Sequence, residues 1–530
     1  MPKLTVDGRE IEVAPGTTVL QAALSVGIEI PHYCWHPGLS VSGNCRMCLV
    51  EIEKVPKLQI ACATEASDGM VVRTGTERVL GARAAMMEFF LIHHPLDCPI
   101  CDQAGECRLQ EYAVEHGAGR SRYVEAKLRS NKAVDIGPHV LLDQERCIRC
   151  SRCVRFCDEV TKTSELAFFR RGESTRIGIH PGRPLANPYS GNVVDLCPVG
   201  ALTLKEFRFQ TRVWFLKNTP TVCAACARGC NVLVAVGQQQ AMMTTSGQLD
   251  DRIKRIVPRP NDEVNGHWIC DEGRLSYERL SSAPRLLSAE APAGSPAEWS
   301  EAVARAAATL RDAASAGKLG AILSPRLVCE DLFAWKRLLE GLGGARIGVR
   351  RLLRGEDDAI LVRADRGANS RGAAWILGED AEESDLLRAV GRGEIDTLLV
   401  VGDPLDPGDA PALDAALRAR LSRVAFVGPF AAGAAAGADV LLPTAAWAEE
   451  DGTYVNFQGR VQRVRRCHRP RGGGRPGWRV ALDLGEAAGI ADPGWTSPDD
   501  VLRALAEAVP ELGGLDAGAL GLLGAKRGGP

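Results

Sequence analysis

The chain has 530 residues, of which 45% are hydrophobic and 25% charged, as in ordinary soluble globular proteins. Its formal net charge of −2 gives no signal for binding nucleic acid or an anionic membrane surface. No apolar run approaches the ~18 residues of a membrane-spanning helix, and the N-terminus MPKLTVDGRE does not resemble a signal peptide. We expect a soluble cytoplasmic chain of roughly three to four domains, which could still dock on a membrane complex.

Cysteine is unevenly distributed along the chain. Sixteen of the 18 cysteines lie between Cys34 and Cys270, and only Cys329 and Cys467 follow them. In a cytosolic chain, clustered cysteines indicate metal ligands rather than disulfides. The alternative, a secreted disulfide framework, would require export and would not explain the recurring C-x2-C spacing. The cysteines therefore predict several metal sites.

Residues 1–78 predict a small β-rich domain. A hairpin is predicted over Leu4–Val13, because apolar residues alternate on both sides of Asp7-Gly8, a strong two-residue turn signal. A helix is predicted over Val19–Val26 and a further strand over Cys48–Ile52. This order of hairpin, helix, cysteine loop and strand resembles the β-grasp fold of plant-type ferredoxins.

The first ligand group lies in this domain and has the pattern C-x10-C-x2-C-x13-C, formed by Cys34, Cys45, Cys48 and Cys62. Four thiolates suit a [2Fe–2S] cluster, a [4Fe–4S] cluster or zinc. Zinc sites usually pair two C-x2-C units and only one is present, so we favour a [2Fe–2S] cluster, with structural zinc as the alternative. Gly43 allows backbone amides to approach the sulfur atoms of such a cluster.

A helix is predicted next, with Thr74 and Glu77 at capping-box spacing and an end before Pro95. The second ligand group follows as H-x3-C-x2-C-x5-C, formed by His94, Cys98, Cys101 and Cys107. A neutral imidazole among thiolates removes one negative charge and should shift the reduction potential, as histidine does in Rieske centres. An iron–sulfur cluster is the favoured interpretation and a zinc site is the alternative. The adjacent His93 lacks the right register for a ligand.

The third ligand group contains the bacterial ferredoxin motif C-x2-C-x2-C-x3-C, formed by Cys147, Cys150, Cys153 and Cys157. In that run the fourth cysteine binds a second cluster, and a distant Cys-Pro completes the first, a role that Cys197-Pro198 fits. Counting back from Cys197 by four, seven and ten positions gives Val193, Ser190 and Asn187, so a second cluster would lack three ligands. We predict one [4Fe–4S] cluster held by Cys147, Cys150, Cys153 and Cys197, with Cys157 as a packed thiol.

The fourth ligand group has the pattern C-x2-C-x3-C-x39-C, formed by Cys223, Cys226, Cys230 and Cys270. The long final gap requires a folded excursion that returns to the site, with strands predicted at Val232–Val236 and Trp268–Ile269. Zinc would be plausible for this group alone, but beside three redox-type groups a [4Fe–4S] cluster is favoured.

From about residue 285 the chain becomes rich in Ala, Leu, Arg and Gly. Helical patterns alternate with short apolar strands, which predicts an α/β region with a parallel sheet. The predicted helices are Trp299–Ala314, Leu332–Leu342 and Ala410–Leu421, and the predicted strands are Leu319–Leu323, Thr397–Val401, Val424–Val427 and Val440–Leu442. The Gly/Ala-rich end of the chain is expected to fray.

The order of these groups resembles the large iron–sulfur subunit, the G subunit, of the NADH-quinone oxidoreductases, which are respiratory complex I. Local stretches carry the resemblance: HHPLDCPICDQAGECRLQ (93–110), ERCIRCSRCVRFC (145–157), GNVVDLCPVGALT (191–203), EEDGTYVN (449–456) and GRVQ (459–462). The last two resemble a molybdopterin-oxidoreductase region that looks shorter than usual in that family.

The resemblance implies an α+β multidomain fold. Its domains are a β-grasp [2Fe–2S] ferredoxin domain (1–78), a one-histidine, three-cysteine [4Fe–4S] domain (79–120), a ferredoxin-like [4Fe–4S] domain (138–210), a molybdopterin-oxidoreductase-type [4Fe–4S] domain (216–275), a truncated α/β molybdopterin-oxidoreductase-like domain (285–510) and a flexible tail (511–530). It also implies that Cys157 is not a ligand, and that the fourth group, found only in some members, holds an extra cluster off the main electron path.

The resemblance further implies an electron carrier with one [2Fe–2S] cluster, three [4Fe–4S] clusters and no molybdenum. Its expected partners are the flavin/NADH-binding subunit, a downstream [4Fe–4S] ferredoxin-type subunit and the quinone-site subunits. Its expected location is the cytoplasmic side of the inner (plasma) membrane, as a peripheral subunit of a proton-translocating complex. No catalytic residue is predicted, because no acid–base pair, nucleophile triad or phosphate loop is recognisable.

Other classes of protein share parts of this layout. A formate dehydrogenase would need a molybdenum-ligating cysteine after the fourth group, and neither Cys329 nor Cys467 is suitably placed. An iron-only hydrogenase would keep all eight ferredoxin cysteines, and a diaphorase subunit of an NAD-reducing hydrogenase would end near residue 210. A related formate dehydrogenase or hydrogenase complex therefore stays the alternative, and a zinc-stabilised scaffold is the non-redox one.

Overall fold

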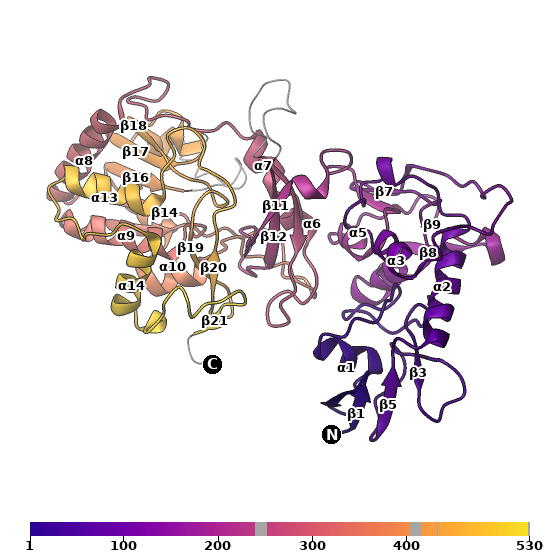
Figure 1. Ribbon diagram of the computed structural model, residues 1–530. Coiled ribbons are helices and arrows are strands. Elements are labelled where there is room, and N and C mark those ends of the chain that lie inside the picture. Colours follow the sequence, from indigo (N-terminus) through magenta and orange to yellow (C-terminus); the bar gives the residue numbers. More distant parts are fainter. Residues whose placement is uncertain (239–251, 403–414, 432, 528–530) are drawn as a thin grey trace. The chain divides into compact units, whose positions relative to one another are not determined.

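The computed structural model describes residues 1–238, 252–402, 415–431 and 433–527. Its contacts divide the chain into two units, Met1–Phe215 and Leu216–Pro530 (Figure 1). None of the helices in the described residues combines the length and the apolar character needed to cross a bilayer.

The first unit begins with a five-stranded sheet in the order β2-β1-β5-β3-β4. Its hairpin turns at Asp7 and Gly8, whose φ values of 45° and 83° are those of the two-residue turn that the sequence predicts. Thr18 caps the helix α1 through a capping box with Gln21, and the apolar face of α1 packs on the sheet. The elements are β1 (Lys3–Val6), β2 (Arg9–Glu12), α1 (Val19–Ser25), β3 (Leu49–Ile52), β4 (Gln59–Ile60) and β5 (Met70–Arg73).

Helix α2 (Glu77–Leu91) ends before Pro95, as predicted, but its N-cap is Thr76 rather than Thr74. The side chain of Thr76 accepts a hydrogen bond from the Val79 amide. Thr74 is instead held by Asp7, which accepts from its amide (2.7 Å) and its hydroxyl (2.5 Å). The expected cap is wrong because the β-hairpin turn already uses Thr74.

The rest of the first unit consists of short elements joined by loops. It contains a three-stranded sheet in the order β10-β7-β6 and the separate hairpin β8–β9. The elements are η1 (Cys98–Ile100), α3 (Arg108–His116), β6 (Val134–Asp135), β7 (Val140–Leu142), α4 (Arg152–Arg155), the π-turn η2 (Phe156–Val160), β8 (Leu166–Phe169), η3 (Gly172–Ser174), β9 (Arg176–Ile179), α5 (Asn192–Leu196), β10 (Leu202–Leu204) and η4 (Val213–Phe215).

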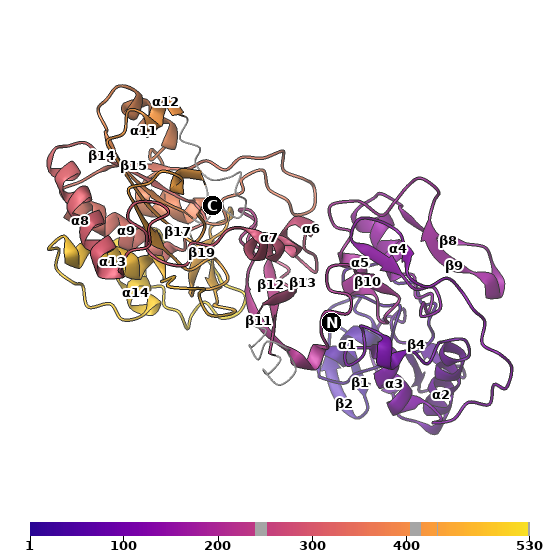
Figure 2. The same ribbon diagram turned by 90° about the horizontal axis from the view of Figure 1, so that it is seen from above.

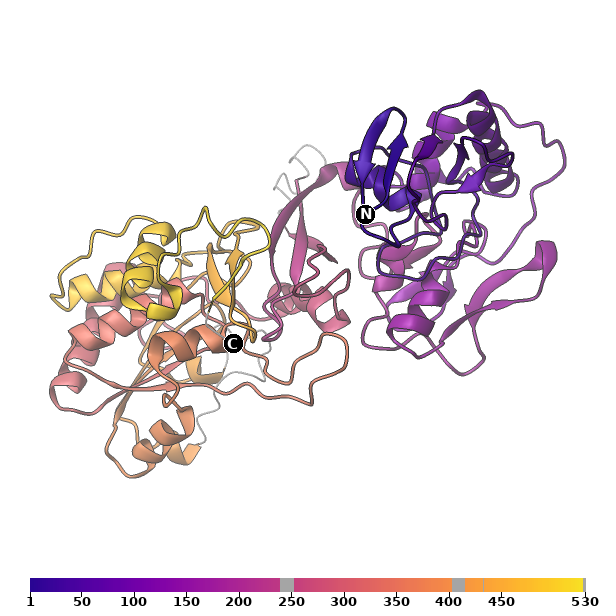
Figure 3. The same cartoon turned by 90° about the horizontal axis from the view of Figure 1, so that it is seen from below.

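The second unit begins with an antiparallel sheet in the order β11-β12-β13, drawn in magenta in Figure 3. The predicted strand at Val232–Val236 lies within β12. The predicted strand at Trp268–Ile269 is wrong: the returning strand is β13, and Trp268–Ile269 forms the irregular approach to α6. The elements are β11 (Leu216–Val222), β12 (Asn231–Gly237), β13 (Ile253–Pro258), α6 (Asp271–Arg274) and α7 (Ser276–Ser282).

An α/β region follows, with an all-parallel sheet in the order β15-β14-β16-β17-β18. All four predicted strands and the predicted parallel pairing are confirmed. Of the predicted helix Ala410–Leu421, residues 410–414 lie outside the described residues. The elements are α8 (Trp299–Ser315), β14 (Leu319–Leu323), α9 (Cys329–Gly341), β15 (Arg346–Val349), α10 (Ser370–Leu377), α11 (Glu383–Gly391), β16 (Thr397–Val401), α12 (Ala415–Arg418), β17 (Arg423–Gly428), η7 (Gly433–Ala435), β18 (Val440–Pro443), α13 (Gly477–Ala487) and α14 (Pro498–Ala508).

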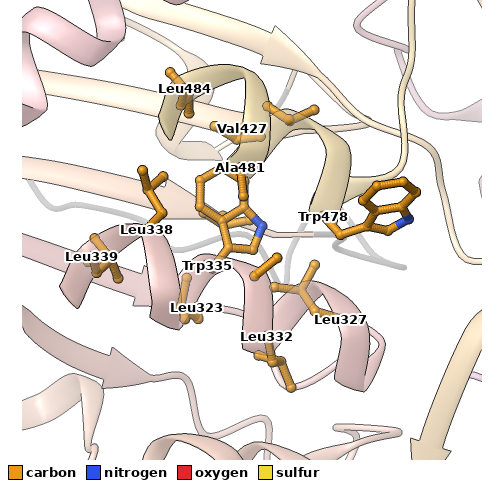
Figure 4. Packing of buried hydrophobic residues seen from close by; sticks show 14 of the residues in the cluster. Leu323, Leu327, Leu332, Trp335, Leu338, Leu339, Val427, Trp478, Ala481 and Leu484 are labelled. Atoms are coloured by element: carbon orange, nitrogen blue, oxygen red, sulfur yellow. The ribbon is translucent and has the colours of Figure 1, made fainter. Parts of the chain in front are cut away.

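Both faces of the parallel sheet are covered, which is why its strands are continuously apolar. Leu399 and Val401 of β16 face a core shared with α8, α9, α13 and α14, whereas Leu398 and Val400 face α11 (Figure 2). The indole of Trp335, from α9, lies in the larger core between the sheet and the α13 residues Ala481 and Leu484 (Figure 4).

The last segment of the described chain is packed. β21 (Ala525–Lys526) pairs with β20 (Arg460–Val464), which in turn pairs with β19 (Gly452–Val455). Leu512, at the end of η8 (Pro510–Leu512), and Leu515 and Leu520 are buried in the larger core. The prediction of a flexible tail is therefore wrong for residues 511–527, because these leucines and the β21 pairing anchor them.

Two carboxyl groups are buried at the start of α9. The Oε2 of Glu330 accepts a hydrogen bond from the Thr453 amide (2.8 Å), and Asp331 accepts one from the Trp478 amide (2.6 Å). Burial raises the pKa of each carboxyl to about 7, and the charge of Glu330 adds to the shift at Asp331. The first turn of α9 is thus held to β19 and α13 by groups that are easily protonated.

The buried Glu330 predicts a pH-dependent stability. Its ordinary pKa is 4.5 and its pKa in the folded chain is about 7, so the folded state binds the proton more tightly than the unfolded state. The stabilisation is complete below about pH 4.5 and is lost as the pH rises through about 7, on the order of 3 kcal/mol. Glu330→Gln should flatten the pH dependence of the thermal midpoint and raise the midpoint above pH 7 by a few degrees.

Glu340→Gln on the same helix is the matched control, because the Glu340 side chain is exposed. The thermal midpoints are measured by scanning calorimetry between pH 5 and about pH 8. If the midpoint falls equally with pH in the wild type and in Glu330→Gln, Glu330 is not the source of the pH dependence.

Candidate metal centres

The thiols of the first ligand group are buried and joined by hydrogen bonds. Cys34 contacts Cys45 and Cys62, and Cys62 also contacts Cys48. These bonds lower the pKa of the Cys34 and Cys48 thiols and raise those of Cys45 and Cys62. Gly43, with φ of 62°, makes the sharp turn into this loop. The structure therefore brings all four predicted residues of this group together.

The second group differs in exposure: Cys98 is exposed, Cys101 is buried and Cys107 is half-buried. The charges of Cys98 and Cys101 act on Cys107, and burial raises the pKa of the Cys101 and Cys107 thiols. Gly200 lies against this group, because a Cβ there would come within 2.2 Å of the Cys101 Sγ. The three thiols thus share one neighbourhood.

His94 is largely withdrawn from solvent. Burial, aided by the charges of Lys127 and Arg146, lowers the pKa of its imidazole to about 4. His94 is therefore neutral at pH 7 and keeps a lone pair that can bind a metal. The adjacent His93 accepts a hydrogen bond from the Leu128 amide and packs edge-on against Tyr123.

Three loops bring the third group together. Cys153 lies in α4, Cys150 precedes that helix, and Cys197 ends α5. One cavity is lined by Cys147, Cys150, Cys153 and Cys197, together with apolar side chains such as Leu142, Ile148 and Ile177. Burial raises the pKa of the Cys147, Cys150 and Cys197 thiols to about 11 and that of Cys153 further.

Cys157 does not line that cavity. It lies in the π-turn η2 with its side chain fully buried. Its carbonyl accepts hydrogen bonds from the Thr163 and Ser164 amides. Burial, with the charges of Glu165 and Asp158, raises the pKa of its thiol to about 12. These surroundings favour a protonated, packed thiol at this position.

All four cysteines of the fourth group are buried. The Cys223 amide donates to the Cys230 carbonyl (2.8 Å), which closes the first loop. Cys270 returns as the N-cap of α6, where its Sγ accepts a hydrogen bond from the Gly273 amide (3.3 Å). A Cβ at Gly273 would come within 2.9 Å of the Cys223 Sγ, so glycine is needed where α6 meets the thiols.

The loop of the fourth group is held by two amide side chains from the distant β19–β20 hairpin. Gln462 donates to the Gly229 carbonyl (3.0 Å), and Asn456 donates to the Arg228 carbonyl (3.3 Å). Gly229 has φ of 63°, and a Cβ there would come within 2.6 Å of the Gln462 Nε2. Asn456 and Gln462 belong to the stretches EEDGTYVN and GRVQ, which carried the resemblance without an assigned role.

The two remaining cysteines are isolated and buried. The Cys329 Sγ contacts the Asn369 side chain (3.5 Å), and the Cys467 Sγ donates to the Arg465 carbonyl (3.3 Å). Burial raises the pKa of both thiols to about 12. No other cysteine is among the groups that act most strongly on either thiol in the described structure, so neither belongs to one of the four ligand groups.

The four groups suit polynuclear clusters chemically. Burial opposes the thiolate charge in each cysteine-rich group, and a cationic iron core would offset that cost. Thiolate sets, one of them with an imidazole, are donor sets that iron–sulfur clusters use, and such clusters when bound carry single electrons.

Sequence reasoning missed a set of arginines between the first and third groups. Arg152 and Arg155, on α4, both donate hydrogen bonds into the loop that carries Cys34. Their positions within ERCIRCSRCVRFC were visible in the sequence. Only the fold shows that they reach residues more than 110 positions away.

Comparison with protein families matches five consecutive parts of the chain. They are a 2Fe-2S iron-sulfur cluster binding domain (2–77), the NADH-ubiquinone oxidoreductase-G iron-sulfur binding region (83–122), the ferredoxin-like domain of NADH-quinone oxidoreductase subunit 3 (137–203), the molybdopterin oxidoreductase Fe4S4 domain (216–282) and molybdopterin oxidoreductase (367–487). The chain is thus an α+β protein with the iron–sulfur and molybdopterin-oxidoreductase modules in the order expected from the sequence.

A solved NAD+-reducing [NiFe]-hydrogenase chain matches 40% of this chain and 91% of its own length, at 32% identity and a TM-score of 0.37.

Curated relatives match about two-thirds of the chain. The G subunit of the Rickettsia felis NADH-quinone oxidoreductase is 41% identical over 351 residues, which are 66% of this chain and 50% of the relative. The mitochondrial 78 kDa NADH-ubiquinone oxidoreductase subunit of Candida albicans is 40% identical over 65% of this chain and 47% of the relative. The chain spans about half the length of these relatives. On these matches, the chain is related to the G subunit of the NADH-quinone oxidoreductases.

Proposed function

We propose that this chain is the electron-transfer iron–sulfur subunit of an NADH-quinone oxidoreductase. In that role it accepts single electrons from a flavin/NADH-binding subunit and passes them toward quinone. It converts no substrate itself. One observation carries this proposal: Cys147, Cys150, Cys153 and Cys197 line one cavity, and Cys157 is not among its lining residues. This arrangement suits the ligand set of an electron carrier.

The proposed cofactors are one [2Fe–2S] cluster and three [4Fe–4S] clusters, with no molybdenum. The proposed ligands are the sixteen residues of the four groups: Cys34, Cys45, Cys48 and Cys62; His94, Cys98, Cys101 and Cys107; Cys147, Cys150, Cys153 and Cys197; and Cys223, Cys226, Cys230 and Cys270. The hydrogen bonds among the first four thiols, the neutral imidazole of His94 and the burial of the fourth group support these sets.

The protein's own contribution is to bury and position these sites. Apolar side chains such as Leu142 and Ile177 line the third site, and low polarity there strengthens every electrostatic interaction with a cluster. Backbone amides at Arg149 and Gly273 point at the Cys147 and Cys270 Sγ atoms, at 3.4 and 3.3 Å. Such hydrogen bonds stabilise sulfur charge and so set the reduction potential.

The proposed partners are the flavin/NADH-binding subunit, a downstream [4Fe–4S] ferredoxin-type subunit and the quinone-site subunits. The proposed location is the peripheral arm on the cytoplasmic side of the inner membrane. The relatives' names as subunits of NADH oxidoreductases support this placement.

The four-cluster assignment predicts about 14 iron atoms per fully loaded chain, with matching acid-labile sulfide. Iron and sulfide assays on the anaerobically purified or reconstituted chain measure this number, and the same elemental analysis should find no stoichiometric molybdenum. An iron content near 10 (one [4Fe–4S] cluster fewer) would contradict the four-cluster assignment.

The ligand choice in the third group predicts opposite effects for two cysteines. Cys197→Ser should lose one [4Fe–4S] signal from the EPR spectrum of the reduced chain, because it removes a proposed ligand. Cys157→Ser should keep every cluster, because its side chain lies outside the cavity. The two variants control each other for general damage, and the reverse result would overturn the assignment.

The proposed electron path predicts that NADH alone reduces no cluster of the isolated chain, whereas dithionite does. Addition of the flavin/NADH-binding subunit should make NADH sufficient, because that subunit holds the site of hydride oxidation. EPR spectra recorded after each addition test this. Reduction of the isolated, flavin-free chain by NADH would refute the proposal that NADH is oxidised on the other subunit. Separately, co-purification of this chain with a molybdenum enzyme would favour a dehydrogenase complex.

A further inference from the structure

We infer that the guanidinium of Arg152 is a shared electrostatic control of the first and third cluster sites, raising the reduction potentials of both. Arg152 lies between Cys150 and Cys153 in the sequence and begins α4. This inference rests on the proposed function, because it requires both clusters to be bound.

The hydrogen bonds of Arg152 reach both sites. Its Nη2 donates to the carbonyl of Trp35 (2.6 Å), the residue after Cys34. Its Nη1 donates to the carbonyl of Leu196 (3.2 Å), the residue before Cys197. One planar side chain therefore fixes the backbone next to a ligand of each site, which the fork geometry of arginine suits.

The charge of Arg152 acts on both sites as well. It interacts with the thiols of Cys150 and Cys197 in the third group, and with those of Cys45 and Cys34 in the first. Its Nε–H is buried and donates to no protein acceptor in the described structure. A buried cation that borders the third cavity and is bonded to the backbone beside Cys34 and Cys197 is suited to sites that gain negative charge on reduction.

The sign of the effect follows from Coulomb's law. Reduction adds one electron to a cluster, and a nearby fixed positive charge stabilises the reduced state. Removal of the charge should therefore lower both reduction potentials.

Arg155 provides a matched control on the same helix. It also donates hydrogen bonds to the loop of the first site, at the Cys34 and Ser40 carbonyls. Arg152 lines the cavity of the third group, and Arg155 is not among the residues that line it. Loss of Arg155 therefore removes contacts to the same loop and leaves in place the arginine that borders the third site.

The test is an EPR-monitored redox titration of the reconstituted full chain, with spins counted for each cluster. Arg152→Gln should shift both reduction equilibria by roughly tenfold toward the oxidised state, which is 59 mV for one electron. Arg155→Gln should lower the potential of the third site by less than Arg152→Gln does, because Arg155 does not line that cavity. Arg152→Lys keeps the charge and should leave both potentials near those of the wild type.

The outcomes separate the inference from the function on which it rests. If the reconstituted wild-type chain shows no EPR signals from the first and third clusters, the proposed function is refuted. Intact signals with unchanged potentials in Arg152→Gln, or a shift at one site alone, would overturn the shared control. If Arg152→Gln fails to assemble, Arg152→Lys decides: potentials near the wild type support the role of the charge, and a tenfold fall at both sites overturns it.

Discussion

The structure depends on one constraint: a negatively charged thiolate is unfavourable in a low-polarity interior, and this chain buries most of its candidate thiolate ligands. Most of the cysteines in the four groups are buried, and burial raises the pKa of the thiols in the third and fourth groups. A thiol in such a place is a poor anion by itself and a good ligand once a cationic core is present. Most elements around the first three groups are short, and in small domains of this kind metal binding commonly contributes to folding.

The same cost explains where the polar side chains lie. Arg152 brings a positive charge to the first and third sites and satisfies the carbonyls of Trp35 and Leu196. His94, a proposed ligand, offers a neutral imidazole in surroundings to which Lys127 and Arg146 add positive charge. The distribution of charge around the sites thus varies along the chain, and potentials can differ between sites that share cysteine ligands.

Spacing alone led to the four proposed ligand groups, because residues that bind an iron–sulfur cluster recur at short, characteristic intervals. The choice of Cys197 over Cys157 needed only the ferredoxin pattern, and the cavity agrees with it. The parallel strands were also predictable, since burial on two faces makes Leu319–Leu323 and Thr397–Val401 continuously apolar. Features set by contacts between distant residues were not: Thr76 caps α2 because Asp7 holds Thr74, and β21 anchors an end that composition suggested would be free.

The α/β region has a structural role at the fourth site that does not depend on a cofactor of its own. Asn456 and Gln462 hold the backbone of Arg228 and Gly229, between Cys226 and Cys230. Gln462 also accepts a hydrogen bond from Asn231, and Thr453, in the same hairpin, is bound to the buried Glu330 of α9. A continuous set of contacts therefore leads from the core of the parallel sheet to the ligand loop. The region after residue 285 therefore helps to fix the backbone that carries the thiols of the proposed fourth site.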